Sequence, residues 1–215
     1  AALLGRNVIG NDINPLSRIL TLPRLRVPDL QELETRLNAI AVDANAKADL
    51  DLAMFYHAKT LKEIISLRNY LAARAASGNE DALDAWIRMV ATNRLTGHSP
   101  GFFSVYTLPP NQAVSATSQT KINRKLKQRP VYRDTRVLIL KKSKQLIGNV
   151  TAAQKENLAR VAGQARFLTQ DAGHTPDIPD DFVHLTVTSP PFLDVVQYAQ
   201  DNWLRGWFNN IDAGA

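Results

Sequence analysis

Apolar residues recur at helical spacing along much of this chain, and their spacing predicts most of its elements. One stripe begins after Pro28, and its members share a single helical face: Leu30, Leu33, Leu37 and Ile40. Further stripes predict helices over these ranges: 16–22, about 60–76, about 80–95, 151–162 and 194–208. Stripes of this kind form the core of most helical domains, so we assign them no chemistry.

Capping signals mark three of the predicted helix starts. Thr60 and Glu63 fit a capping box for the helix over 60–76, and Asn79 fits the N-cap of the next helix. Thr151 and Gln154 fit a second capping box. These residues satisfy backbone N–H groups that the first turn of a helix leaves without partners.

Three short segments show strand patterns instead. Residues 7–13 and 165–169 are short runs with an apolar centre, and 184–188 alternates Leu185 and Val187 with β-branched threonines. A pair of prolines follows the last segment and ends it, because proline has no N–H to donate. Strands separated by helical sequence predict parallel neighbours in one sheet.

This order predicts an α/β fold with an interrupted sheet. We expect residues 1–22 and 151–215 to form parts of one sheet domain. The long stretch between them, residues 23–150, is predicted as a mainly helical and basic insertion.

Composition narrows the choice of function. The chain has 215 residues, a net charge of +6 and a pI near 9.7, which favour an anionic partner. It has no cysteine, which excludes disulfides, thiolate–metal sites and a cysteine nucleophile. The four histidines, at 57, 98, 174 and 184, show no ligand spacing, so we predict no metal site. No apolar run approaches the ~18 residues of a membrane span and no secretory signal is visible, so the cytoplasm is the expected location.

Basic residues concentrate over 121–144, where Asp134 is the one acid. Two interpretations stay open: a solvated helix face, or a surface that contacts nucleic-acid phosphates. The candidate phosphate contacts are Lys121, Arg124, Lys125, Lys127, Arg129 and Arg133. The apolar run 137–140 within the segment indicates that it is folded.

Two carboxylates follow the first two predicted strands. Asp12 comes after the strand at 7–13, and Asp171 comes after the strand at 165–169. In doubly wound folds, an acid at a strand's carboxyl end bonds the ribose hydroxyls of a nucleotide cofactor, and a second acid can accept from an adenine amino group. The alternative is that both residues only form turns, as aspartate often does.

The third predicted strand ends in a stiff loop, Thr188-Ser189-Pro190-Pro191-Phe192. Ligands of open α/β sheets bind at the carboxyl ends of the strands. The Ser189 hydroxyl and the Pro190 carbonyl could accept N–H bonds, and the Phe192 ring could stack on a planar base. Such a loop suits a base with an exocyclic amino group.

With these residues the chain resembles the S-adenosylmethionine-dependent amino-methyltransferases of DNA, which methylate cytosine N4 or adenine N6. Residues 188–192 are similar to the family's catalytic loop, Ser/Asp/Asn-Pro-Pro-Tyr/Phe. The segment 8–15 is similar to the one whose acid holds the cofactor ribose, and 167–172 to the one whose acid meets the adenine. The matches cover roughly a quarter of the chain, at its two ends.

The resemblance implies a Rossmann-like methyltransferase sheet with a large helical insertion, and S-adenosylmethionine as cofactor. It implies catalytic roles for Ser189, Pro190, Pro191 and Phe192. It implies cofactor contacts from Asp12, Ile13, Asp171, Ala172 and Thr188. The target base would be flipped out of duplex DNA, and its nitrogen would attack the methyl group directly.

Cytosine N4 is the favoured target, because serine before the two prolines leans that way within the family. The absence of cysteine agrees, since cytosine C5 methylation needs a thiolate nucleophile. Expected partners are double-stranded DNA and a cognate restriction endonuclease, with no membrane. The alternatives are an RNA or protein-amide methyltransferase, and a nucleic-acid-binding remnant without catalysis.

One departure from the family concerns the start of the sequence. The family's Gly-rich loop lies ~20 residues before the ribose acid by analogy with dinucleotide folds, and Asp12 is too close to residue 1 for that. The expectation is therefore an N-terminally truncated chain whose first strand is missing and which, as given, binds its cofactor poorly or is inactive.

Overall fold

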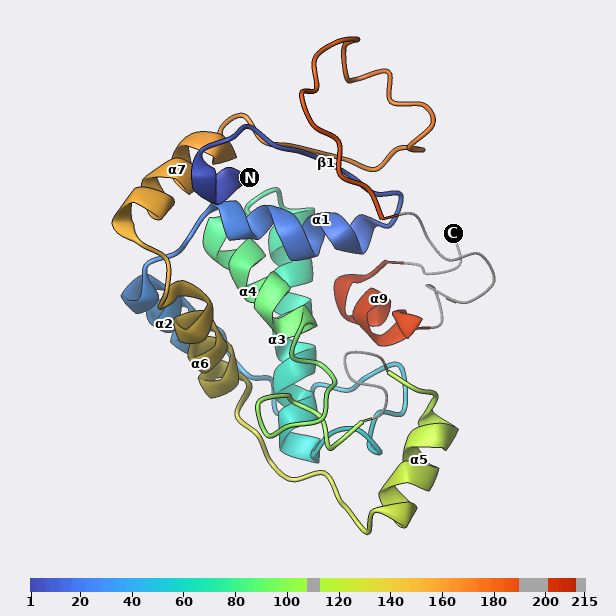
Figure 1. Cartoon of the computed structure of the whole chain (residues 1–215). Helices are drawn as coiled ribbons and strands as arrows, with labels where there is room; N and C mark the ends of the chain where they lie inside the picture. The colour runs from blue at the N-terminus through green and yellow to red at the C-terminus, as the bar shows by residue number, and fades with distance from the viewer. Residues whose placement is uncertain (108–112, 190–200, 212–215) are drawn as a thin grey trace.

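The computed structural model describes residues 1–107, 113–189 and 201–211, and these ranges are mainly helical (Figure 1). The N-terminal elements are η1 (Ala2–Leu4), β1 (Ile9–Asn11), α1 (Pro15–Thr21) and η2 (Leu22–Leu25). The central helices are α2 (Leu30–Ala39), α3 (Ala58–Ala76), α4 (Ala82–Thr92), α5 (Ala116–Lys125) and α6 (Thr135–Ile147). The C-terminal elements are α7 (Ala152–Ala162), β2 (Arg166–Leu168) and α9 (Trp203–Asn209).

The hydrophobic core lies among the central helices. The predicted stripe of α2 is confirmed: Leu33 and Leu37 are buried against α6. Ile64 of α3 and Ile87 of α4 have no exposed surface. Figure 1 shows α3 and α4 at the centre of the molecule, with α2 and α6 on one side and α9 on the other. Burial of these side chains supplies the main stabilisation, about 1.5–3 kcal/mol for each fully buried large aliphatic residue.

Helix α9 joins this core although it is far away in the sequence. Its residues Leu204 and Phe208 are buried in the same cluster as those of α3 and α4. The Trp207 indole donates to Asp49, at 2.6 Å, and the Arg68 guanidinium donates to the Trp207 carbonyl, at 2.8 Å. Helix α9 is therefore packed on the central part of the chain, between residues 30 and 147.

Two of the predicted helix caps are wrong and one is confirmed. His57, not Thr60, caps α3, and Thr60 instead donates its hydroxyl to the Arg133 carbonyl. Asp81, not Asn79, caps α4. The capping box of Thr151 with α7 forms as predicted. Asp81 and Asn79 are both short polar side chains just before a helix, so local sequence did not separate them. His57 caps α3 through its ring nitrogen, although histidine is not a preferred N-cap residue.

The predicted capping role of Glu63 is wrong because its carboxylate binds residues far away in the sequence. The side chain is buried, and one carboxylate oxygen accepts from both the backbone N–H and the hydroxyl of Thr135, the first residue of α6. The other oxygen accepts from the Tyr132 hydroxyl at 2.9 Å. Glu63 thus links α3 to the start of α6, a role that depends on contacts between distant parts of the sequence.

Strands β1 and β2 pair in parallel, as predicted for the segments 7–13 and 165–169. Their register places Ile9 opposite Arg166 and Asn11 opposite Leu168. Gly10 lies opposite Phe167, and a Cβ at Gly10 would come within 2.7 Å of the phenylalanine ring. The pairing requires glycine at this position because the ring occupies the space of a side chain.

The prediction of a third strand over residues 184–188 is wrong. No strand forms there, and Leu185 and Val187 are 79% and 86% exposed. A strand needs a hydrogen-bonded neighbour, and among the described residues β1 and β2 pair only with each other. Figure 1 shows residues 169–189 as a long loop standing away from the helices beyond β1. The described part of the chain is therefore helical with a two-stranded parallel sheet, and it shows no Rossmann-like sheet.

Among the described residues, no helix combines the length and the apolar character that crossing a bilayer demands.

Candidate functional site

The carboxyl ends of β1 and β2 lie side by side and form the candidate site. The Asp12 backbone N–H donates to the Leu168 carbonyl at 3.1 Å, which extends the parallel pairing by one residue. The Gln170 backbone N–H then donates to the Asn11 side-chain oxygen at 3.0 Å. Because the two strands run parallel, the residues that follow them, Asp12 and Asp171, leave the sheet at the same edge.

Asp12 forms the turn that starts α1. One carboxylate oxygen accepts from the Asn14 N–H at 2.9 Å, and the other accepts from the Ser17 hydroxyl at 2.5 Å. Asn14 in turn caps α1 by accepting from the Leu16 N–H. The Asp12 side chain is exposed, and each of its oxygens has a second lone pair that can accept from a ligand. Its turn-forming role and its predicted ligand role are therefore compatible.

Asp171 also forms a turn. Its Oδ1 accepts from the Gly173 N–H at 2.8 Å, and Asp171 and Ala172 are both exposed. The other oxygen of Asp171 accepts no hydrogen bond from the described residues. This geometry leaves one carboxylate oxygen available at the edge where Asp12 lies.

Asn11 and Gln170 belong to this edge, and the sequence analysis did not single them out. The Asn11 side chain joins the two strand ends, while the Gln170 amide nitrogen donates to Asp177. The Gln170 side-chain oxygen is buried and has no hydrogen-bond partner among the described residues. A buried acceptor without a partner is costly unless a ligand or water supplies a donor.

The predicted catalytic loop is only partly described. Thr188 and Ser189 are exposed and form no hydrogen bond with the described residues. Pro190, Pro191 and Phe192 lie outside the described residues. The structure therefore places the two predicted cofactor carboxylates after paired parallel strands, with Ile13 and Ala172 beside them in the sequence, and no hydrogen bond between described residues joins Ser189 to either carboxylate.

The basic segment forms the exposed end of α5 and the turn after it. Ser115 caps this helix by accepting from the Ser118 N–H. The following basic side chains are all exposed: Lys121, Arg124, Lys125, Lys127 and Arg129. None of them forms an ion pair with a described acidic residue. We call these five residues the α5 basic surface.

Arg133, the sixth predicted phosphate contact, is placed differently. One of its guanidinium nitrogens donates to the carbonyls of Ser99 at 3.2 Å and Phe102 at 2.7 Å, and also to the Ser104 carbonyl. Burial of the guanidinium lowers its pKa from the usual value. These contacts give Arg133 a structural role, since it holds the loop between α4 and α5 together.

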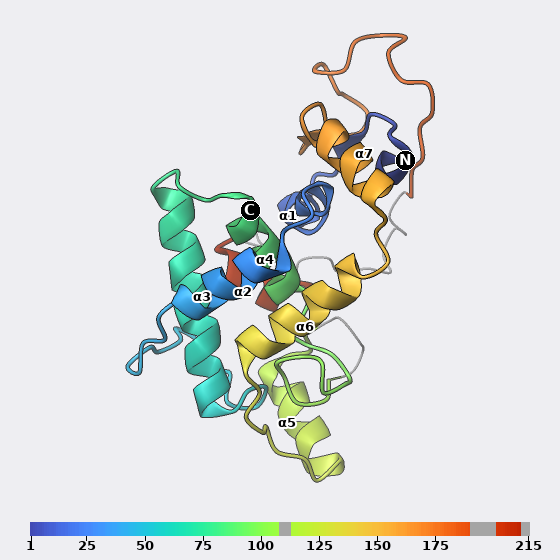
Figure 2. The same cartoon turned by 90° about the vertical axis from the view of Figure 1, so that its left-hand side faces the viewer.

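The α5 basic surface and the strand ends lie at opposite ends of the molecule. In Figure 1, α5 is at the bottom and β1 at the top, and in Figure 2 α5 is again farthest from the N-terminus and α7. The structure therefore does not bring the predicted phosphate contacts to the predicted cofactor site. A ligand that touches both must be extended.

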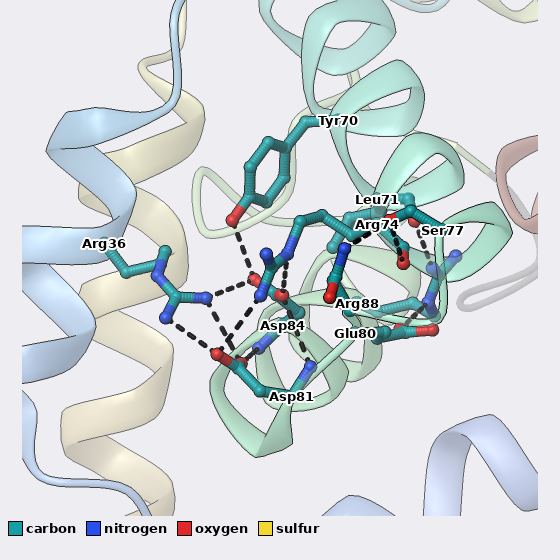
Figure 3. Close-up of polar contacts among 10 residues, drawn as sticks. Arg36, Tyr70, Leu71, Arg74, Ser77, Glu80, Asp81, Asp84 and Arg88 are labelled. Carbon is teal, nitrogen blue, oxygen red and sulfur yellow. Dashed lines mark hydrogen bonds and ion pairs between the residues drawn. The ribbon is translucent and has the colours of Figure 1, made fainter.

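A separate polar network lies at the start of α4 (Figure 3). The Asp84 carboxylate has no exposed surface, and it accepts from Arg36 of α2 and from Arg74 of α3, each at 2.7 Å. The Tyr70 hydroxyl donates to the same carboxylate at 2.9 Å. Asp81 pairs with Arg36 at 2.8 Å. Every member has a partner within the network, so it joins three helices and leaves none of these charged groups unpaired.

Comparison of the chain with protein-family models, with curated proteins and with solved structures finds no match. Over the ranges that the structure describes, no three histidine or acidic side chains gather as a metal site would require.

Proposed function

We propose that this chain belongs to the S-adenosylmethionine-dependent amino-methyltransferases of DNA, with cytosine N4 as the favoured target. The observation that carries the proposal is the parallel pairing of β1 with β2, which puts Asp12 and Asp171 at one edge. The proposal also implies that the two strands belong to a Rossmann-like methyltransferase sheet.

The residues at this edge suit S-adenosylmethionine. The Asp12 carboxylate can accept from ribose hydroxyls, and the Asp171 carboxylate can accept from the adenine amino group. Ile13 is 75% exposed, so an apolar surface is present beside these acceptors. Exposed isoleucine next to hydrogen-bond acceptors is a suitable surface for a purine nucleoside.

The chain's own residues would position the target base. The Ser189 hydroxyl and the Pro190 carbonyl accept hydrogen bonds from the exocyclic amino group, and Phe192 stacks on the flipped base. The bound cofactor supplies the methyl group. Holding the nitrogen in line with that group is the main contribution of the protein, since orientation alone can account for several kcal/mol of the barrier. The chain has no cysteine to form the covalent intermediate of C5 methylation.

The α5 basic surface is the proposed contact with the DNA backbone. Five exposed cations without described acidic partners suit a row of phosphates, whereas base-specific readout needs other side chains. Because this surface is remote from the strand ends, the proposal requires a long duplex that extends along the molecule.

Cofactor binding tests the strand-end site directly. Equilibrium dialysis with labelled S-adenosylmethionine compares the parent chain with Asp12→Asn and Asp171→Asn. Each carboxylate bond to a ligand donor contributes about 1.5–3 kcal/mol, so each variant should bind about 10- to 100-fold more weakly. Asp51→Asn is the matched control, because Asp51 is also an exposed aspartate that accepts from a backbone N–H two residues later. Equal cofactor binding by all three variants would show that Asp12 and Asp171 do not form the cofactor site.

Methyl transfer tests the reaction. The chain is incubated with labelled S-adenosylmethionine and unmethylated duplex DNA, and the nucleosides of the DNA are then separated. Label in N4-methylcytosine supports the proposal, and label in N6-methyladenine keeps the enzyme class but changes the target base. Label only in RNA or polypeptide supports the alternative methyltransferases. DNA binding without any cofactor binding supports a non-catalytic nucleic-acid-binding protein.

A further inference from the structure

An open cleft of about 620 Å³ lies beside α4. The cleft is lined on one side by α1, including Arg18, by η2 and by Arg26 directly after η2, and on the other by α4, including Ala85. Ala165 and Asn209 of α9 also line the cleft. The volume lies within the range of about 300–1,000 Å³ that is typical of small-molecule sites.

The cleft is separate from the candidate cofactor site. Ala165 directly precedes Arg166, the first residue of β2, so the cleft lies by the amino end of that strand. Asp12 and Asp171 follow the opposite, carboxyl ends. A ligand in the cleft would contact both the central helices and the junction of α7 with β2.

Asn209 provides a fixed acceptor without a partner. Its side chain is only 8% exposed, and its amide nitrogen donates to the Thr92 hydroxyl at 3.0 Å and to the Arg205 carbonyl at 2.9 Å. The Arg205 carbonyl can only accept, so these two bonds fix which side of the amide is nitrogen. The Oδ1 atom is buried and accepts no hydrogen bond from the described residues. Such an atom is expected to have a donor in the functional state.

The acidic residues that line the cleft are paired, whereas two of its arginines have no ion-pair partner among the described residues. The two acidic residues that line it are already paired, Glu80 with Arg88 at 2.7 Å and Asp81 with Arg36. Arg18 and Arg26 are exposed and form no ion pair with a described acidic residue. Two uncompensated guanidinium groups at the edge of a cleft favour an anionic ligand.

The rest of the lining is apolar. Small alanines from α4 and α7 face leucine and isoleucine side chains of α1 and η2: Ala82, Ala85, Ala162, Ile19, Leu22 and Leu25. We propose that the cleft binds a small amphipathic anion with an apolar body and one N–H or O–H donor. The anionic group lies by Arg18 and Arg26, the apolar body packs against the alanines and leucines, and the donor reaches the buried Asn209 Oδ1 through a shift of that side chain on binding.

Indole-3-acetate is a suitable probe, because it combines a carboxylate, an apolar ring and one ring N–H. Titration into the ¹⁵N-labelled chain should give saturable shifts of the Ala82, Ala85 and Ala165 amides and of the Asn209 side-chain amide. Indole-3-acetamide lacks the charge, and 1-methylindole-3-acetate lacks the N–H. Each analogue should bind about tenfold more weakly than the parent probe.

A pair of variants separates specific recognition from general attraction of an anion. Arg18→Gln/Arg26→Gln should weaken indole-3-acetate about tenfold and leave indole-3-acetamide unchanged. The control, Lys144→Gln/Lys155→Gln, removes the same charge from exposed positions that do not line the cleft, and it should bind both probes like the parent.

Three results would overturn the proposal. The first is the absence of saturable shifts up to about 10 mM probe, which corresponds to an affinity too weak for a specific site. The second is equal binding of the parent probe and its methylated and neutral analogues. The third is a set of shifts that maps away from α4 and Asn209. All three are read from the titration itself, so they are independent of methyl transfer and of S-adenosylmethionine binding.

Discussion

At the scale of single residues, the buried Asp84 carboxylate shows how one charge can join several helices. This carboxylate has no exposed surface and receives donors from α2 and α3, through Arg36, Arg74 and Tyr70 (Figure 3). Asp84→Asn leaves two guanidinium groups facing a neutral side chain. Breaking a buried pair in this way costs about 3–5 kcal/mol, so urea unfolding should show a loss of that size in the free energy of unfolding.

The control for this variant is Asp43→Asn. Asp43 is exposed and accepts from the Asn45 N–H at 2.8 Å, a local contact within one turn. Its replacement should change the free energy of unfolding by less than about 0.5 kcal/mol. Equal losses in the two variants would mean that the network does not hold the three helices together.

Asp81 gives the network a pH dependence. The hydrogen bond from Arg36 holds the pKa of this carboxyl below its usual value. A lowered pKa in the folded chain adds stability above the unfolded value of about 3.9, and this contribution is lost as the pH falls through the folded value. Unfolding in urea at a series of pH values should show this loss on the acid side, with a shallower slope for Arg36→Gln. An identical slope in both proteins would contradict the assignment to Asp81.

The sequence predicted some side-chain contacts of the helix starts and not others. Thr151 and Gln154 form the capping box that their spacing indicates, because both partners lie within four residues. Glu63 has the same local pattern, yet it accepts from Thr135, 72 residues further along the chain. Local patterns therefore fail to identify a cap where a distant donor binds the side chain, as with Glu63, or where a neighbouring polar residue takes the role, as Asp81 does for α4.

At the scale of elements, the pairing of β1 with β2 depends on one small residue. The Phe167 ring covers Gly10, where a Cβ would lie 2.7 Å from ring atoms. Gly10→Ala should therefore destabilise the chain by about 1–3 kcal/mol, the usual cost of overpacking. Phe167→Ala should relieve the clash, so the double variant should lose less stability than the sum of the two single variants.

Gly101→Ala is the control for this prediction. A Cβ at Gly101 would lie 3.5 Å from the Ser99 hydroxyl, its nearest neighbour outside the adjacent residues, which is ordinary contact. Thermal unfolding of the parent and these four variants would measure the difference in stability. A Gly10→Ala variant as stable as Gly101→Ala would show that the ring moves aside without cost.

The segment 184–188 shows the limit of strand prediction from sequence. Alternating Leu185 and Val187 describe a side-chain pattern that suits a sheet, but they do not supply the neighbouring strand. In the described residues this neighbour is absent and both side chains are exposed. The segments that became β1 and β2 were predicted correctly because each provides the hydrogen-bonding partner of the other.

At the scale of the whole molecule, the candidate site was predictable where it depends on chain direction. Two acidic residues after two parallel strands must leave the sheet at the same edge, so Asp12 and Asp171 could be placed together from sequence. The distance between that edge and the α5 basic surface could not be predicted from the sequence. It depends on how the helices pack between them, and charge patterning carries no information about this arrangement.

The α5 basic surface gives the last prediction, the salt dependence of DNA binding. Lys125→Gln/Lys127→Gln/Arg129→Gln removes three exposed cations from one end of the molecule. If each contacts a phosphate, the plot of log affinity against log salt should lose a slope of about 0.9 for each cation removed. Fluorescence anisotropy with a labelled duplex measures this slope.

The matched variant, Lys47→Gln/Lys144→Gln/Lys155→Gln, removes the same charge from exposed positions elsewhere on the chain. It should weaken binding only through net charge and keep nearly the parent slope, because counterions are released at contacted phosphates. Arg133 is left intact in both variants, since its bonds to the Phe102 and Ser104 carbonyls hold a loop. Equal slopes for the two triple variants would show that the basic residues of α5 form a solvated helix end, and that DNA, if bound, contacts another face.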